Sequence, residues 1–261
     1  MFPVPFYQHS LFLIVVAVVV GLLVGSFLNV VIARVPERRS LWRPGSACPG
    51  CGSAIAWYDN IPILSFVALR GRCRACATPI SWRYPIVEAV TAALFAAAGL
   101  AFGSTLEGVV AAALLAGLVA LTAIDLERQI IPDAISLPGI LVGVLANLAT
   151  GRVSWVESLL GIGVGGGVFL VIILASGGGM GAGDMKLGAM LGAFLGWKVV
   201  LLSVFVAVVL GGALAVTLIA SGLRGRKDPI PFGPFLAAGG AAGLFWGERV
   251  VRWYLSGVGA F

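Results

Sequence analysis

The chain has 261 residues, of which 60% are hydrophobic and only 11% are charged, and its mean hydropathy is +1.07. A soluble domain of this length needs more charge to cover its surface, so the composition excludes an ordinary soluble protein. The net charge of +6 does not indicate nucleic-acid binding, because membrane proteins collect Lys and Arg in their cytosolic loops.

Apolar runs of the length that spans a bilayer, about 20 residues, recur along most of the chain. They predict an all-α integral membrane protein with about eight transmembrane helices. The expected spans are residues 10–33, 86–103, 107–124, 134–150, 155–176, 185–196, 199–221 and 234–255. The sixth run is short, so it is either half a span or continues into the seventh through Trp197 and Lys198.

A polar segment, residues 34–85, separates the first span, within residues 1–33, from a polytopic region, residues 86–261. If this segment faces the cytosol, thirteen of the 17 Lys and Arg residues fall in cytosolic loops. The remaining four, on the other side, are Arg152, Lys198, Arg249 and Arg252. This asymmetry predicts a multi-pass protein of the bacterial cytoplasmic membrane, with residues 34–85 in the cytosol.

All four cysteines lie in the polar segment, as two C-x-x-C pairs: Cys48, Cys51, Cys73 and Cys76. Four thiolates at this spacing are typical of a tetrahedral Zn²⁺ site, and a glycine after the first pair, Gly52, permits the tight turn such a site needs. Two disulfides are the alternative, but disulfides are rare in the reducing cytosol. With four protein ligands the zinc would be structural, since no coordination position stays open for chemistry.

Three aspartates lie at the ends of predicted spans. Asp125 ends the third span, where a carboxylate meets the unfavourable end of the helix dipole, and ionisable groups at membrane depth are usually functional. Asp133 follows Pro132 and opens the fourth span, so a helix N-cap role explains it. Asp184 follows a glycine-rich strip that starts at Gly177, and an N-cap role is again the structural alternative.

Asp125 and Asp184 fall at the same cytosolic border of the predicted topology. Two neighbouring carboxyl groups share one proton, so one can activate water while the other polarises a carbonyl group. The pattern therefore predicts an aspartic peptidase that works without a catalytic metal. In the strip itself, Gly181 and Gly183 would allow an extended peptide to approach. Lys186 could tune the carboxyl pair or bind a carboxylate, or it could be an interfacial lysine.

Two further features have competing interpretations. Glu88 opens the second span, where it could bind a substrate amine or could simply be an acid favoured by the helix dipole. The run from Gly161 to Gly167 matches a dinucleotide-binding pattern, but it lies inside an apolar span with no strand before it. Close packing between membrane helices explains that run better.

The motifs together resemble the type IV prepilin peptidase family, whose members are leader peptidases and N-methyltransferases. The resemblance covers nearly the whole chain in order. It rests on residues 25–32, 57–65, 71–76, 83–88, 125–133, 181–187 and 230–235. The four cysteines combined with the G-x-G-D sequence of residues 181–184 make it specific.

The resemblance implies a function. Family members cut the basic leader from prepilins, and from the pseudopilins of type II secretion systems, at the cytosolic face. Many then methylate the new N-terminus with S-adenosylmethionine. The family's catalytic aspartates correspond to Asp125 and Asp184, and its zinc ligands to the four cysteines. The full cysteine set makes methyltransferase activity an expectation, whereas no motif locates the S-adenosylmethionine site.

Three alternatives stay open at this point. A presenilin-type intramembrane protease shares the G-x-G-D strip but lacks the cysteine segment. A transporter could use paired membrane acids to bind cations, although such sites usually lie near the midplane of the bilayer. A zinc-ribbon adaptor is disfavoured because spans flank the cysteine segment on both sides. The expected partners are therefore pilin-like peptides and the lipid bilayer, with no nucleic acid.

Overall fold

The computed structural model describes residues 11–175, 180–223, 225 and 228–258, so Gly177 to Gly179 of the glycine-rich strip lie outside the described residues. Helices and turns make up this part of the chain, with two isolated β-bridges and no strand among the described residues. The chain forms two compact units, Met1–Ala120 and Leu121–Phe261. The all-α prediction is confirmed for the described residues.

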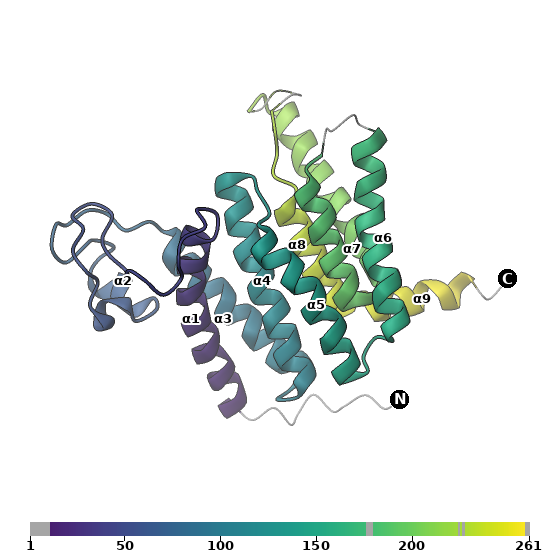
Figure 1. The fold of residues 1–261 in the computed structure, drawn as a ribbon, viewed down its shortest axis with the longest axis horizontal. Helices are drawn as coiled ribbons and strands as arrows, with labels where there is room; N and C mark the ends of the chain where they lie inside the picture. The colour runs from purple at the N-terminus through teal and green to yellow at the C-terminus, as the bar shows by residue number, and fades with distance from the viewer. Residues whose placement is uncertain (1–10, 176–179, 224, 226–227, 259–261) are drawn as a thin grey trace. The chain divides into compact units, whose positions relative to one another are not determined.

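The N-terminal unit is built on a close pair of helices, α1 (Leu11–Arg34) and α3 (Arg83–Phe102) (Figure 1). Glycines on α1 allow this contact: a Cβ atom at Gly21 or Gly25 would lie 2.6 or 2.7 Å from a backbone Cα atom of α3. Gly21 meets Ala92 and Gly25 meets Glu88, so the two helices run antiparallel. Small residues commonly make such close contacts between membrane helices.

The segment between these two helices contains two short helical elements. They are a 3₁₀ turn, η1 (Trp57–Asn60), and one turn of helix, α2 (Leu64–Ala68). The segment contains several exposed large apolar residues and little buried apolar surface. It therefore depends on cross-links and polar contacts for its shape rather than on a hydrophobic core.

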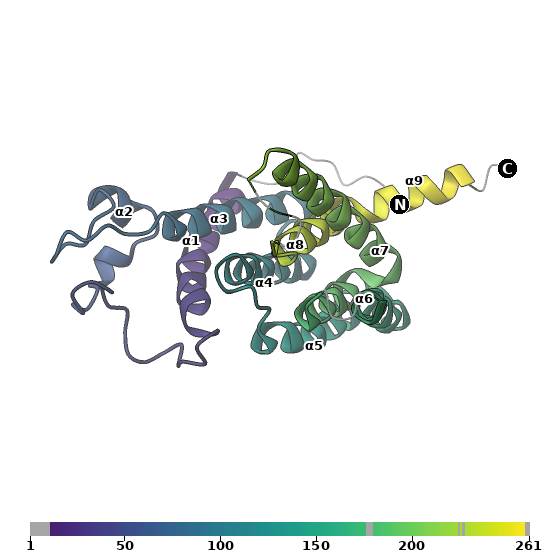
Figure 2. The same ribbon diagram turned by 90° about the horizontal axis from the view of Figure 1, so that it is seen from above.

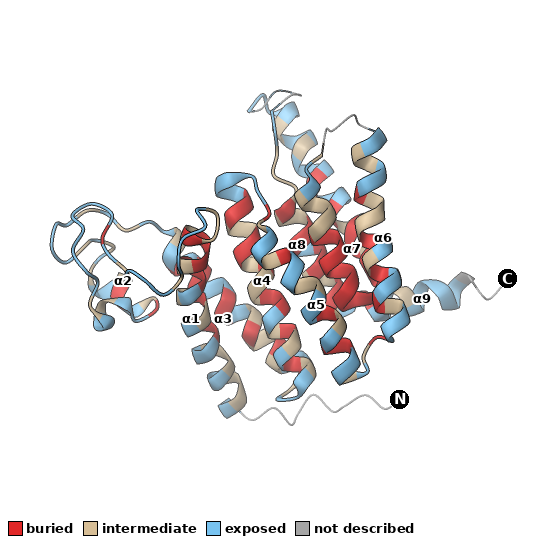
Figure 3. Ribbon diagram, viewed as in Figure 1, coloured by how far each residue is buried: buried red, intermediate tan, exposed pale blue. Residues whose placement is uncertain are grey.

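The C-terminal unit contains the end of α4 (Leu106–Arg128) and a bundle of further helices (Figure 2). These are α5 (Asp133–Thr150), α6 (Trp155–Ala175), α7 (Ala182–Ala220), α8 (Gly233–Ala242) and α9 (Glu248–Val258), with a π-helical turn, η2 (Gly243–Gly247), before α9. Buried residues concentrate on α7 and on the faces of its neighbours that meet it (Figure 3). The core of this unit therefore lies around α7.

The long helix α7 folds back on itself at Gly196, whose φ of 75° and ψ of 169° interrupt the helix. Contacts with the α8–η2 helix show the reversal. Gly240 and then Gly243 on that helix lie against Leu191 and then Leu195 of the first arm, residues 182–195. The same helix meets the second arm, residues 197–220, in the opposite order. Phe235 lies against Gly211, Gly239 lies against Ser203, and Gly247 lies against Val199. The two arms therefore run in opposite directions.

Side chains from neighbouring helices stabilise the break. In a continuous helix the carbonyl of Ala193 would accept from the N–H four residues later, but Gly196 interrupts that pattern. Asn147 on α5 and Ser158 on α6 instead donate to the Ala193 oxygen, at 2.8 and 2.5 Å. All of these polar groups are buried, so their pairing removes a desolvation cost that would disfavour the fold-back.

Glycines bring α6 and the first arm of α7 into backbone contact. Gly161 lies against Gly192 and Gly165 lies against Gly188, so close that no Cβ atom would fit at these positions. This confirms the helix-packing interpretation of the glycine run. Gly163 and Gly167, on other faces of α6, have nothing within 4 Å of an added Cβ.

Six described helices are long and apolar enough to cross a membrane: Leu11–Arg34, Arg83–Phe102, Leu106–Arg128, Asp133–Thr150, Trp155–Ala175 and Ala182–Ala220. The predicted sixth and seventh spans are the two arms of α7, and the predicted eighth covers α8, η2 and most of α9. A polytopic membrane protein is confirmed, whereas a count of eight crossings is not fixed by helix length alone.

Candidate functional site

The four cysteines form one cluster, with all sulfur atoms within 4.8 Å of one another. The sulfurs of Cys48 and Cys76, one from each pair, are 3.8 Å apart. A tetrahedral zinc ion with Zn–S bonds of about 2.3 Å requires sulfurs about 3.8 Å apart. The donor set and its spacing therefore fit Zn²⁺, and four protein ligands would close its coordination shell.

The two C-x-x-C pairs adopt the same turn. The N–H of Cys48 donates to the Ser53 carbonyl and the N–H of Cys73 donates to the Thr78 carbonyl, both at 2.9 Å. The residue after each pair has a left-handed backbone: Gly52 has a φ of 72° and Ala77 a φ of 58°. The turn expected at Gly52 is confirmed, and the second pair repeats it with alanine in the strained position.

Local hydrogen bonds favour thiolates in the cluster. The Ser53 side chain lowers the pKa of Cys51, backbone N–H groups of Cys76 and Ala75 lower that of Cys73, and Thr78 lowers that of Cys76. Backbone N–H groups act in the same direction on Cys48, but burial and the neighbouring thiols raise its pKa to about 11. Four thiolates this close repel one another, which a cation at their centre relieves.

An ion pair ties η1 to the second cysteine turn. The Arg74 guanidinium donates to both carboxylate oxygens of Asp59, at 2.7 to 3.1 Å, and lies 5.6 Å from the centre of the Tyr58 ring. Arg74 lowers the pKa of Asp59 by this hydrogen bonding. Asp59 therefore has a structural partner inside the cysteine segment.

Asp125 lies in the last turn of α4, and only 6% of its surface is exposed. Its Oδ2 atom accepts a hydrogen bond of 2.9 Å from the backbone N–H of Gly233, at the start of α8. A Cβ atom at position 233 would lie 2.6 Å from the same oxygen, so glycine is required there for this contact. The carboxyl group is thus held by a residue 108 positions away in the sequence.

Asp184 lies in the first turn of α7, half-buried, and its charge interacts with that of Asp125. The neighbouring Gly183 packs against Ile131, in the loop that follows Asp125: a Cβ at Gly183 would lie 2.9 Å from the Ile131 Cβ. This contact brings the start of α7 to the end of α4. Asp125 and Asp184 therefore lie at the same end of the C-terminal unit.

Asp133, which was expected as an N-cap, does not cap its helix, and neither does Asp184, for which an N-cap was the structural alternative. Helix α5 begins at Asp133 itself, with Pro132 as its N-cap, and α7 begins at Ala182, with Gly181 as its N-cap. The N-cap interpretations of Asp133 and Asp184 are wrong because each helix starts before or at the acid. Both acids still lie in the first turn, where the helix dipole favours negative charge.

Lys186 forms an ion pair with Asp133. Both side chains are partly exposed, at 29% and 57%, so the pair contributes at most about 1 kcal/mol. The contact links the start of α7 to the start of α5. It accounts for the position of Lys186 without a direct interaction with the carboxyl pair.

Glu88 lies elsewhere, in the N-terminal unit, where only 6% of it is exposed. Its Oε2 atom accepts a 2.8 Å hydrogen bond from the backbone N–H of Ile63. The helix-start interpretation does not describe this contact, because Glu88 lies beyond the first turn of α3 and bonds a distant loop.

Sequence reasoning assigned no role to Gly233 or Ile131, although both lie in segments that carried the family resemblance. The signal that could have found Gly233 is its place between two prolines, Pro231 and Pro234, after a charged loop. Such a glycine marks a backbone that approaches another group closely.

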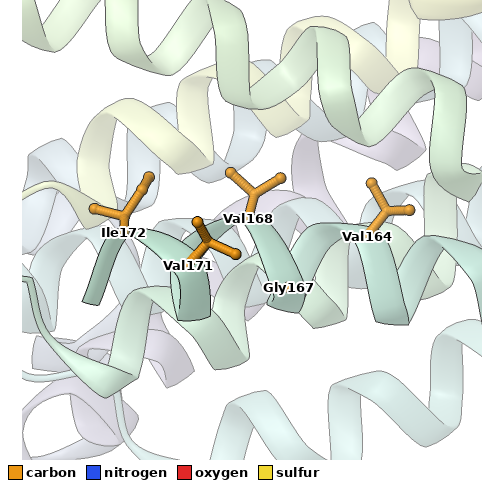
Figure 4. Close-up of a pocket in the computed structure, with 5 residues that line it drawn as sticks. All are labelled: Val164, Gly167, Val168, Val171 and Ile172. Carbon is orange, nitrogen blue, oxygen red and sulfur yellow. The ribbon is translucent and has the colours of Figure 1, made fainter. Parts of the chain in front are cut away.

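A hollow of about 410 Å³ lies along α6, lined by Val164, Gly167, Val168, Val171 and Ile172 (Figure 4). All of these residues are apolar, so the hollow offers no group for acid–base chemistry or for metal binding.

Two family sequence models match the chain. The Bacterial Peptidase A24 N-terminal domain matches residues 19–102, and the Type IV leader peptidase family matches residues 112–216. No solved structure matched the chain.

Curated relatives are similar over most of their length. A prepilin leader peptidase/N-methyltransferase of Burkholderia pseudomallei (strain 1026b) is 40% identical over 88% of this chain and 84% of the relative. Proteins of the same name from Aeromonas hydrophila and Pseudomonas aeruginosa PAO1 are 40% and 36% identical, over 91% and 97% of their own lengths. This chain belongs to the type IV leader peptidase family.

Proposed function

We propose that this family member cuts the leader peptide from type IV prepilins and pseudopilins at the cytosolic face of the membrane, with Asp125 and Asp184 as the catalytic pair. We further propose that it methylates the new N-terminus with S-adenosylmethionine. The observation that carries the peptidase proposal is the meeting of two separate aspartates at one end of the C-terminal unit. The shared name of the relatives supports both activities.

The chemistry follows from two carboxyl groups that share a proton. The ionised member takes a proton from water as the water oxygen attacks the carbonyl carbon of the scissile bond. The protonated member donates its proton to the carbonyl oxygen. When the tetrahedral intermediate collapses, the C–N bond breaks and the leaving amine takes the proton that the first carboxyl group took from water. One hydroxyl group of the intermediate returns its proton to the second carboxylate, which restores the shared proton. The Gly233 N–H holds Asp125 in place during these steps.

The residues around the pair have supporting roles in this proposal. Gly183 lets α7 approach Ile131 closely, and Gly181 provides extended backbone immediately before α7. Lys186 holds α7 to α5 through Asp133. These contacts position Asp184 rather than take part in the reaction, so we assign proton transfer to the two aspartates alone.

Methyl transfer belongs, in this proposal, to the N-terminal unit. S-adenosylmethionine, when bound, supplies an electrophilic methyl group on a positively charged sulfur. Glu88 provides a buried acidic group with no basic partner among the described residues of this unit, which fits a cationic ligand. The zinc ion would fix the cysteine turns and, through the Asp59–Arg74 pair, the segment that leads to Ile63.

The charge asymmetry of the loops supports the orientation, with the cysteine segment and both aspartates on the cytosolic side. In this proposal the fold-back of α7 gives two crossings, and α8, η2 and α9 provide one more, which makes eight. The 14-residue first arm is about 21 Å long, so it crosses a bilayer that is thinned around the protein. At about 1.5 Å per residue, the 24-residue second arm is about 36 Å long, enough to cross the hydrocarbon core.

The peptidase proposal is tested with Asp125→Asn, Asp184→Asn and Asp133→Asn, assayed on a purified prepilin. Asparagine keeps the shape but cannot exchange a proton, so the first two variants should lose cleavage by at least about 100-fold. Asp133→Asn is the control, since it removes an acid from the same end of the unit but keeps an oxygen that can accept from Lys186. The exposed ion pair contributes at most about 1 kcal/mol, so this variant should lose no more than a few-fold in rate.

Two results would contradict the assignment. Loss of cleavage in Asp133→Asn with normal cleavage in Asp125→Asn would show that the pair is wrongly chosen. Equal cleavage by all three variants would exclude an aspartyl mechanism. The yield of detergent-solubilised protein and its elution as a single species, measured for each variant, show whether the protein has folded.

A further inference from the structure

Three unusual features meet in the N-terminal unit, between α1, α3 and the loop before α2. The first is Glu88, an acidic side chain buried between helices. Its contacts are with the Ile63 N–H and the Ser26 side chain, and no ion pair involves it among the residues that the structure describes. A buried carboxylate without a positive partner is costly, and a bound cation would offset that cost.

The second feature is Asn29, one turn from Ser26 on the same face of α1, and only 3% exposed. Its amide N–H₂ group donates to the carbonyls of Gly25 and Tyr84, the latter one turn before Glu88 on α3. Its Oδ1 atom is buried and has no hydrogen-bond partner. Buried polar atoms are nearly always paired in folded proteins, so this oxygen is an acceptor available to a donor that is not part of the chain.

The third feature is the backbone of Ile63, which has a φ of 59° and a ψ of −47°. A β-branched residue in this region of φ/ψ space is a strong outlier, which costs of order 1–3 kcal/mol and concentrates at functional sites. The strained peptide presents its N–H to Glu88 at 2.8 Å, and thereby fixes one of the two carboxylate oxygens.

We propose that Ser26, Asn29 and Glu88 form a binding site for a primary ammonium group. The three side chains offer a hydroxyl oxygen, an amide oxygen and a carboxylate, which matches the three N–H donors and the single charge of R–NH₃⁺. A guanidinium would need a planar array of acceptors, and a divalent metal ion prefers several carboxylates.

The inference rests on the methyl transfer proposed above, where two reactants carry such a group. One is the processed peptide, through its new N-terminus. The other is the methyl donor, through the α-amino group of its methionine part. The site recognises the same chemistry in both, so binding measurements must distinguish them.

The test uses two pairs of competitive inhibitors of peptide methylation. One pair is a processed peptide and its des-amino analogue, in which hydrogen replaces the N-terminal ammonium. The other pair is S-adenosylhomocysteine and its analogue without the α-amino group. For the reactant that uses the site, removing the ammonium should weaken inhibition of the wild-type protein at least tenfold.

Glu88→Gln is the decisive variant, because glutamine keeps an oxygen that can accept from the Ile63 N–H while it removes the charge. In this variant the two members of the inhibitor pair, with and without the ammonium group, should differ in inhibition by about twofold or less. Glu107→Gln, which removes an acid from the first turn of α4 in the same unit, should keep the full discrimination. Ser26→Ala gives a second, milder variant and should reduce the discrimination severalfold.

The possible results distinguish binding of the peptide, binding of the methyl donor and failure of the inference. If Glu88→Gln abolishes the difference between the peptide and its des-amino analogue, the site binds the peptide that accepts the methyl group. If it abolishes the difference between S-adenosylhomocysteine and its analogue without the amino group, the site binds the methyl donor. If Glu88→Gln and Ser26→Ala discriminate as the wild type does, or if the wild type does not discriminate in either pair, the inference is wrong. Absence of methylation by the wild type would instead contradict the proposed function, which is a separate result.

Discussion

At the scale of single residues, the candidate peptidase site depends on glycines as much as on the two aspartates. Gly233 donates its N–H to Asp125 and leaves no room for a side chain, and Gly183 lets α7 reach the loop after α4. Acid–base catalysis requires the reacting groups to be placed within a fraction of an ångström. In the proposed mechanism, these glycines therefore control the rate of cleavage through the position of the carboxyl groups.

Gly233→Ala should lower the rate of leader cleavage by about 10- to 100-fold. The added methyl group would displace the Asp125 carboxyl, since a Cβ there lies 2.6 Å from Oδ2. Gly212→Ala is the matched control, because a Cβ at that position meets nothing within 4 Å. Cleavage assays on equal amounts of folded protein provide the measurement, and a normal rate for Gly233→Ala would show that Asp125 does not depend on this contact.

At the scale of elements, the two cysteine turns are near copies that differ at one informative position. Gly52 in the first turn and Ala77 in the second both have a left-handed backbone. An L-residue with a side chain pays about 1–2 kcal/mol there, whereas glycine does not. The second turn therefore carries strain that the first avoids, and the zinc ion would hold both.

Exchanging these residues should change zinc affinity in opposite directions. Gly52→Ala should weaken zinc binding by about tenfold, because about 1.4 kcal/mol corresponds to a factor of ten. Ala77→Gly should strengthen it by less, since the added freedom of the unfolded chain offsets part of the gain. Gly45→Ala, at an open position without a left-handed backbone, is the control. Competition with a chromogenic chelator measures all three, and equal affinities would contradict the role of backbone strain.

At the scale of the whole molecule, the number of crossings depends on the fold-back at Gly196. With the fold-back, both ends of α7 lie on one side of the membrane. A straight helix of 39 residues would place them on opposite sides. The topology therefore provides a test of the fold as well as of the orientation.

Cysteines introduced at exposed positions test the crossing pattern in intact spheroplasts with a membrane-impermeant maleimide. Ser221→Cys, at the end of α7, should react only after lysis, because eight crossings place it in the cytosol with the native cysteines. Ser104→Cys, in the loop between α3 and α4, should react in intact spheroplasts. Labelling of Ser221→Cys before lysis would show that α7 crosses once.

The amino-acid sequence by itself determined the class of protein, the cysteine cluster and the two candidate aspartates. Each of these rests on a local pattern: apolar runs of membrane length, paired C-x-x-C motifs, and acids at the ends of apolar runs. The predicted sixth span also ends at residue 196, where the structure breaks α7, although the sequence leaves open whether it continues into the seventh span. The N-cap prediction for Asp133 and the N-cap alternative for Asp184 were wrong because each acid lies inside the first turn, after Pro132 and Gly181 at the caps.

Only the tertiary structure decided which groups meet. The Gly233–Asp125 contact joins residues 108 positions apart, and the Lys186–Asp133 pair joins residues 53 positions apart. The cluster of Ser26, Asn29, Glu88 and Ile63 likewise draws on two helices and a loop. A sequence pattern shows the periodicity of apolar and polar residues within one element. Which elements pack together depends on how their faces fit, and the sequence of one element does not show which element it will contact.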